Sequence, residues 1–209
     1  MKFQGLSIAA ITISVLLVTA GAQANTKDDE NPKAPHAVGN RPILINGTAT
    51  MVGRWSCGGD VKIQTTPDPS EPPAPGLPTG VRVSAVTSVP AIDCGDATMN
   101  KHLRKALKDD LFPEIRFKTD KYDLIENGKA VRTAGELTIA GVTKPVEIEA
   151  TLTPVSDGTR VSGKIDVNMT DFGVKPPSLF FGSLKVAQTV SIQFDTVVRS
   201  PSQVSQSFR

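Results

Sequence analysis

The sequence predicts a mainly β protein, built as an eight-stranded antiparallel barrel with one amphipathic α-helix. Apolar and polar side chains alternate with a period of two in eight separate segments, as expected for strands that bury one face. Several breaks between these segments carry glycine-containing turn sequences that suit tight hairpins. Eight strands can close into a small up-and-down barrel, which leaves no exposed sheet edge.

The first 24 residues read as a secretory signal peptide. Lys2 precedes an apolar run, and Ala22-Gln23-Ala24 forms a cleavage site of the small-x-small type. The run is shorter than the roughly 20 residues that span a bilayer, so we expect cleavage and not a membrane anchor. The segment contains no cysteine, which excludes a lipid-modified N-terminal cysteine. The protein is therefore expected in the periplasm or outside the cell.

The remaining chain is long enough for one domain with a sizeable core, which we place at residues 41–199. Residues 25–40 and 200–209 are polar and have no periodicity, so we expect both to be flexible tethers. The net charge of the whole chain is only +2. Such a chain lacks the basic surplus that binding to nucleic-acid phosphates requires, and no nucleic-acid partner is predicted.

The chain has two cysteines, Cys57 and Cys94. Because an exported protein meets an oxidising compartment, we predict a disulfide between them. The alternative is a pair of separately buried thiols, which only sensitivity to a reductant would distinguish.

The first half of the domain is expected to contribute three strands, at residues 41–55, 61–65 and 80–87. Between the second and the third, residues 67–78 read PDPSEPPAPGLP. Proline cannot donate a hydrogen bond to a strand ladder, so this segment is predicted to be a stiff surface loop.

The second half is expected to contribute five strands, and short turns should pair each of the first four with its successor. Asn127-Gly128, Gly141 and Asp157-Gly158 fall in the breaks between these four strands. The predicted strands lie at residues 114–125, 130–140, 146–155, 159–170 and 183–198.

Residues 97–110 have a helical period instead. Met99, Leu103, Ala106 and Leu107 fall on one face, and basic residues occupy the rest of the surface. The sequence leaves two interpretations of this basic face open: an ordinary solvated face, or transient contact with an anionic membrane surface.

The alternation also predicts which side chains face the interior. In residues 135–150, GELTIAGVTKPVEIEA, two consecutive strands each present one apolar and one polar face, and the last strand repeats this pattern. If all apolar faces point inward, the interior either is filled by side chains or holds one small elongated ligand. The pattern does not separate these two possibilities.

Three blocks carry a resemblance to a known family: HLRKALKDDLFPEIRFKT, GELTIAGVTKPVEIEATL and MTDFGV, in this order. They resemble the YceI family of exported lipid-binding proteins over about residues 97–198, and INGTATMVGRWSC upstream is similar in a less regular way. The resemblance implies a lipocalin-like extended barrel with a helix packed against it. It also implies an interior tunnel for a long-chain isoprenoid or related amphiphile, with no catalysis and no cofactor.

Combining this resemblance with the alternation gives a set of candidate ligand-binding residues. We place Trp55 and Phe181 nearer an end of the tunnel, where Phe181 either acts as a hydrophobic gate or packs beneath its own loop. The residues expected along the tunnel are Phe117, Leu137, Ile139, Val146, Ile148, Ile165, Ile192 and Phe194.

Two other classes of function remain as alternatives. A fully packed barrel would make the protein a structural or protein-interaction module, and a titratable pair at the rim would favour an enzyme acting on a lipid head group. His36 and His102 are the two histidines, neither lies in a hydrolase motif, and no Cys/His spacing resembles a metal site. The sequence leaves the oligomeric state open, with a homodimer as one option.

Overall fold

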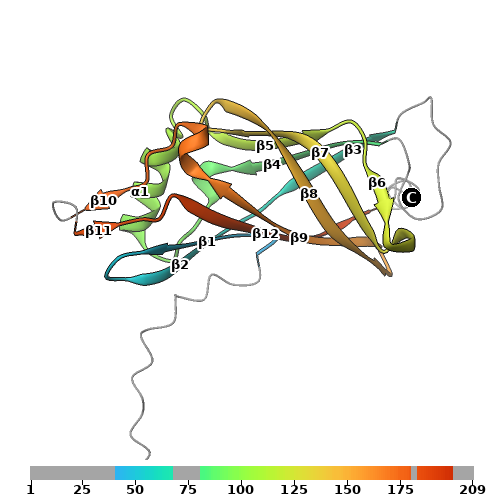
Figure 1. Cartoon of the computed structure of the whole chain (residues 1–209), viewed down its shortest axis with the longest axis horizontal. Coiled ribbons are helices and arrows are strands. Elements are labelled where there is room, and N and C mark those ends of the chain that lie inside the picture. The colour runs from blue at the N-terminus through green and yellow to red at the C-terminus, as the bar shows by residue number, and fades with distance from the viewer. Residues whose placement is uncertain (1–40, 68–80, 180–182, 200–209) are drawn as a thin grey trace, which may run out of the picture. The chain divides into compact units, whose positions relative to one another are not determined.

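The computed structural model describes residues 41–67, 81–179 and 183–199, and it confirms the predicted fold class of antiparallel strands with one helix (Figure 1). The signal peptide, both tethers, the proline-rich loop from residue 68 onward and Phe181 lie outside these residues. The elements of the first half are β1 (Ile43–Ala49), β2 (Gly53–Gly59), β3 (Lys62–Pro67), β4 (Val81–Ser88), η1 (Val89–Ala91), α1 (Ala97–Leu107) and β5 (Glu114–Thr119). Those of the second half are β6 (Asp123–Ile125), η2 (Glu126–Gly128), β7 (Ala130–Ile139), β8 (Val142–Val155), β9 (Gly158–Asn168), η3 (Met169–Phe172), β10 (Ser178–Leu179), β11 (Leu184–Lys185) and β12 (Thr189–Val198).

Ten of these strands form one curled sheet. Its order is β2-β1-β12-β9-β8-β7-β5-β4-β3, with β6 paired to β7, while β10 and β11 form a separate ribbon. Consecutive strands of the second half pair as predicted at the β7–β8 and β8–β9 hairpins. At the first of these, Ala140 and Gly141 form a two-residue turn with φ of 48° and 80°, the left-handed pair that a tight hairpin requires.

The predicted number of eight strands was too small, and the largest difference lies in residues 41–55. This stretch was predicted as one strand, but it folds as the β1–β2 hairpin, with a reversal through residues 50–52. The reversal was not predicted because Met51 and Val52 are apolar and therefore consistent with a continuing strand, whereas an Asn-Gly pair would have indicated a turn. The remaining difference comes from short strands: β6 and β11 were not separated from the predicted strands at 114–125 and 183–198, and β10 lies in the predicted loop before the last strand.

The helix α1 has a defined start and end. The Asp96 side chain caps its N-terminus by accepting a hydrogen bond of 2.8 Å from the Met99 N–H. It ends at Leu107, earlier than the predicted residue 110, because Lys108 turns into the left-handed conformation with φ of 56°. The apolar face of α1 packs against the barrel core through Leu103, Ala106 and Leu107.

The segment before α1 pairs with the free edge of β2 at Gly58. Gly58 and Asp93 exchange two backbone hydrogen bonds, of 2.7 and 2.9 Å. The predicted disulfide between Cys57 and Cys94 is present beside this pair, and the Cys57 side chain is completely buried. Among the described residues no ladder joins β2 directly to β3, so this cross-link and its bridge hold the side of the barrel where the sheet path ends.

A polar contact continues from the disulfide into α1. The Asp93 carboxylate accepts hydrogen bonds of 2.9 Å from both the Gly95 N–H and the Asn100 side-chain amide, and Asn100 Oδ1 accepts one of 2.7 Å from the Cys94 N–H. These bonds fix the first turn of α1 to the segment that carries the disulfide.

We expect this contact to make stability depend on pH. The hydrogen bond from Asn100, followed by that from Gly95, holds the pKa of Asp93 below its usual value of 3.8. Because the folded-state pKa is lowered, the contribution is present above the unfolded pKa and is lost as the pH falls through the folded value. Asn100→Ala should lower the urea midpoint at neutral pH. The difference in urea midpoint between this variant and the unmodified chain should become smaller below about pH 4. A difference that stays constant through the acid range would contradict this.

None of the helices in the described residues is long and apolar enough to cross a bilayer.

Candidate functional site

The curled sheet encloses a cavity of about 220 Å³, which we call the barrel cavity. Its walls come from eight strands and the loop residues Val61, Tyr122 and Arg199, and most of the side chains are apolar. Six of the predicted ligand-binding residues line it: Phe117, Leu137, Ile148, Ile165, Ile192 and Phe194.

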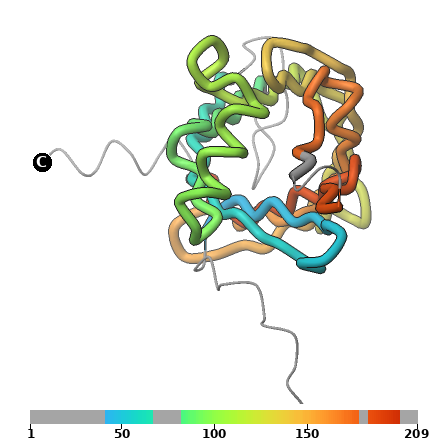
Figure 2. Tube along the Cα trace, turned by 90° about the vertical axis from the view of Figure 1, so that its left-hand side faces the viewer, coloured from blue at the N-terminus to red at the C-terminus, as the bar shows by residue number. Residues whose placement is uncertain are grey.

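A second cavity of about 260 Å³ lies beneath α1, and we call it the helix cavity. Figure 2 looks onto this end of the barrel, with α1 (green) along one side and the β1–β2 turn (cyan) across from it. Trp55 and Ile139 of the predicted set line this cavity, together with Ile192. Leu103, Ala106 and Leu107 of α1 also line it.

The two cavities share part of their walls. Ile45 of β1, Ile115 of β5 and Ile192 of β12 line both cavities. These three side chains therefore lie at the boundary of two adjoining apolar compartments, and we call them the isoleucine partition. The interior of this barrel is therefore not fully packed.

Val146 is the predicted residue that the structure brings to neither cavity wall. It is half-buried and packs against the core, opposite Gly135 in the β7–β8 ladder. The Phe117 ring lies over the interior face of Gly135, where a Cβ atom would come within 2.5 Å of it. An aromatic ring thus occupies the interior at the level of Val146.

Some wall residues were not in the predicted set. Ile45 and Ile115 belong to segments whose alternation was recognised, and the register that places them in the partition is a tertiary feature. The helix residues had a clear period, but that period predicts only that a face is buried and not that it borders a cavity. His102 is half-buried and lines the helix cavity.

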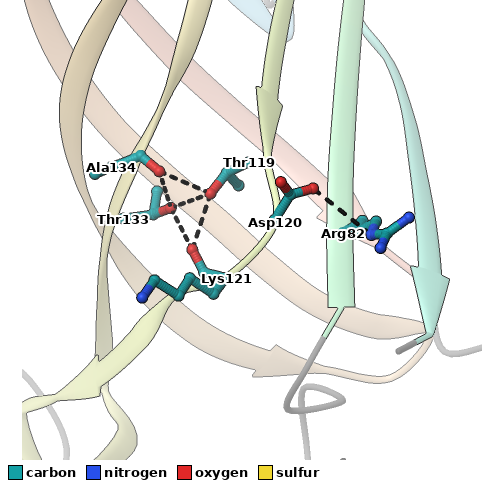
Figure 3. A network of polar contacts seen from close by, with 6 residues as sticks. All are labelled: Arg82, Thr119, Asp120, Lys121, Thr133 and Ala134. Atoms are coloured by element: carbon teal, nitrogen blue, oxygen red, sulfur yellow. Dashed lines mark hydrogen bonds and ion pairs between the residues drawn. The ribbon is translucent and has the colours of Figure 1, made fainter. Parts of the chain in front are cut away.

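Two polar side chains of the barrel cavity, Thr119 and Thr133, have a structural explanation. The Thr119 and Thr133 hydroxyls lie 2.7 Å apart, where either can donate to the other, and each lies 2.8 Å from the Lys121 carbonyl oxygen (Figure 3). Thr119 also lies 2.9 Å from the Ala134 carbonyl. Two hydroxyl protons serve these carbonyls, so the pair fixes the corner between β5 and β6 to β7. On the outside of the same corner Arg82 and Asp120 form an exposed ion pair at 3.6 Å.

The aromatic walls depend on glycines that leave room for them. Gly163 is paired with Phe194, and a Cβ on Gly163 would lie 2.4 Å from the Phe194 ring and 2.7 Å from the Glu149 carbonyl oxygen. Both contacts are closer than real Cβ atoms tolerate, and one of them is to backbone. The Phe194 ring can therefore occupy the wall only because residue 163 has no side chain.

Gly163→Ala is expected to lower the free energy of unfolding by about 1–3 kcal/mol, since the added methyl overpacks a fixed site. The measurement is urea denaturation followed by circular dichroism. Gly59→Ala is the matched control, because its Cβ would meet Ile92 and Thr87 at 3.4 Å without a clash. Equal losses in the two variants would show that the effect is general to glycine in these strands.

Among the residues that the structure describes, no group of three or more His, Cys, Asp or Glu side chains is placed to hold a metal ion.

Comparisons with known proteins agree with this architecture. Residues 45–198 match the family model described as YceI-like domain. Protein YceI of Shigella flexneri is 27% identical over 179 residues, which cover 81% of this chain and 87% of that protein. Protein YceI of Escherichia coli O157:H7 gives the same values.

Solved structures share the fold. The crystal structure of Burkholderia cenocepacia BcnA has a TM-score of 0.59 at 18% identity, over 75% of this chain and 96% of that one. A polyisoprenoid binding domain from Saccharophagus degradans has a TM-score of 0.56 at 12% identity, over 76% and 94% of the two chains. Because the family model matches most of the chain, this protein belongs to the YceI-like domain family.

Proposed function

We propose that this protein binds a long-chain isoprenoid or related amphiphilic lipid inside the barrel, without altering it, and carries or stores that lipid in the periplasm or outside the cell. The observation that carries the proposal is the pair of apolar compartments on either side of the isoleucine partition.

Their size argues for a ligand that uses both. Each compartment alone, at about 220 and 260 Å³, is smaller than the roughly 300 Å³ at which small-molecule pockets begin. An elongated chain that passes the partition would fill both, and each buried methylene would contribute about 0.8 kcal/mol. Apolar walls of this kind suit a hydrocarbon chain and offer little to a polar or charged molecule.

The non-catalytic part of the proposal rests on the chemistry of the walls. His102 lies among apolar side chains in the helix cavity, and the Thr119 and Thr133 hydroxyls hold backbone carbonyls. Neither constellation pairs a nucleophile with a base that is itself oriented by a third group, as acyl or phosphoryl transfer by side chains requires. The name of the Saccharophagus degradans domain, which shares this fold, supports a polyisoprenoid as the ligand class.

Native mass spectrometry of the protein purified from its own host, followed by lipid extraction, tests the proposal. We expect a bound species with the mass of a long-chain lipid, and uptake of added isoprenoids by protein that has been stripped. The emission of Trp55, the single tryptophan of the chain and part of the helix cavity wall, provides a second measurement of occupancy. Repeated recovery of an empty chain that takes up no added isoprenoid would overturn the proposal.

A further inference from the structure

The end of the barrel at α1 exposes several large apolar side chains. Met51 is 79% exposed, Leu111 is 71% exposed and Val52 is 60% exposed, the highest values among the large hydrophobic side chains described. Met51 and Val52 form the β1–β2 turn, and Leu111 follows α1. Val52 also lines the helix cavity, as does the 37% exposed Met99, so these two side chains form part of the rim of that cavity.

The turn residue Met51 is a poor choice for folding. Its φ of 70° lies in the left-handed region, which Asn, Asp and Gly adopt far more readily than Met. With 79% of its surface in solvent, the side chain gains almost nothing from the core in return. A residue that breaks a local rule without a compensating contact indicates a functional constraint, and here it stands next to the rim of a cavity.

The same end carries exposed cations. Lys101 and Lys105 project from the outer face of α1, and Lys108 is the C-cap residue of this helix. Two further exposed cations are Arg54 of β2 and Lys185 of β11. Asp109 and Asp110 share a shallow groove with the lysines, and Asp96 caps the helix, so they offset part of this charge. The surplus is positive and exposed, which makes any attraction to an anionic surface sensitive to salt.

We propose that this end of the barrel docks on an anionic membrane surface, with Met51 and Val52 entering the headgroup region and the exposed lysines of α1 contacting lipid phosphates. Apolar side chains flanked by lysines are the combination that binds bilayer interfaces. Docking in this orientation presents the rim of the helix cavity to the membrane, so that a lipid passes between the two with less exposure to water. The inference rests on the proposed lipid-binding function and adds the partner surface and its orientation.

Flotation of the purified chain with lipid vesicles tests the proposal. One set of vesicles contains phosphatidylcholine alone, and the other contains equal parts of phosphatidylcholine and phosphatidylglycerol. We expect binding to the second set, decreasing as salt is added, and much weaker binding to the first. No binding to vesicles containing phosphatidylglycerol would overturn the proposal.

Met51→Asn separates docking from folding. Asn tolerates the left-handed conformation, so the thermal midpoint should be unchanged or raised, while vesicle binding should fall about tenfold because an apolar side chain no longer enters the interface. Leu124→Asn is the matched control, since Leu124 is 42% exposed in β6 at the opposite end of the barrel (Figure 1), and it should leave vesicle binding unchanged. An equal loss in both variants, or no loss in Met51→Asn, would contradict the proposed orientation.

The lysines provide an independent test. Lys101→Gln and Lys105→Gln should each lower binding to vesicles containing phosphatidylglycerol by about fivefold and leave the weak binding to phosphatidylcholine unchanged.

Sedimentation of the unmodified chain and of Met51→Asn tests whether a second copy of the chain covers this surface instead of a membrane. A dimer that Met51→Asn dissociates, with vesicle binding unchanged, would assign the surface to self-association and overturn the proposal.

The proposed function and the docking surface can fail separately. Uptake of added isoprenoid by the chain in solution, with no flotation, would overturn docking and leave lipid binding intact. Flotation without uptake would overturn lipid binding, because docking then delivers nothing to the cavity.

Discussion

Ala85→Trp is expected to abolish most of the lipid uptake. Ala85 lies in β4 between Ile63 and Phe117 of the neighbouring strands, and it lines the barrel cavity. An indole ring at this position would take the space of several methylenes. Displacing about four of them would cost about 3 kcal/mol, which corresponds to about 100-fold in affinity.

The measurement is uptake of a defined isoprenoid by stripped protein, followed by native mass spectrometry. Ala134→Trp is the matched control, because Ala134 is an exposed residue of β7 whose neighbours Thr133 and Gly135 point inward. Circular dichroism and the thermal midpoint establish that both variants fold. Full uptake by folded Ala85→Trp would show that the barrel cavity is not where the lipid lies.

A side chain that fills the helix cavity distinguishes a ligand that occupies both cavities from a ligand that occupies only one. Ala106→Trp would place an indole ring in the helix cavity, which Ala106 lines from α1. If the lipid passes the isoleucine partition, both filling variants should impair uptake of a long chain. If only one of them does, the ligand occupies a single compartment and must be shorter than proposed.

The strands of the second half were predictable because their signals are local. Asn127-Gly128, Gly141 and Asp157-Gly158 each carry turn chemistry, and the structure turns at all three. At the β1–β2 turn the glycine, Gly53 with φ of 74°, stands after the central residues, and Met51 itself adopts a left-handed conformation that its side chain disfavours. Sequence rules fail at this turn because they describe what folding prefers, and we infer a different constraint on Met51.

The sequence predicts which side chains of the site face the interior, but it does not predict that the interior contains two cavities. Alternation predicts that Leu137, Ile165 and Phe194 face the interior, because a strand residue and its second neighbour share a face, and all three line the barrel cavity. The isoleucine partition depends on three segments that meet only through sheet curvature and register, and no local pattern encodes this. The position of Val146 depends likewise on a ring from another strand, that of Phe117, which lies over Gly135.

Removing the disulfide should give the largest loss of stability. Cys57 and Cys94 are 37 residues apart, and closing a loop of this length stabilises by about 4 kcal/mol in the chain-entropy model. That is a large part of the roughly 5–15 kcal/mol that separates folded from unfolded domains. We therefore expect Cys57→Ala/Cys94→Ala to lower the free energy of unfolding by about 4 kcal/mol in urea denaturation.

The location of the cross-link argues that the loss will reach the cavities. It joins β2, whose Trp55 lines the helix cavity, to the segment that leads into α1, which forms another wall of the same cavity. Without it, α1 is held against β2 by the two Gly58–Asp93 hydrogen bonds, the Asn100 contacts and the apolar packing of its inner face. Lipid uptake should therefore fall in the double variant at temperatures where it is still folded. A reductant should likewise lower the stability and the lipid uptake of the unmodified chain, and it should leave those of the double variant unchanged. A double variant as stable as the unmodified chain would show that packing alone closes this side of the barrel.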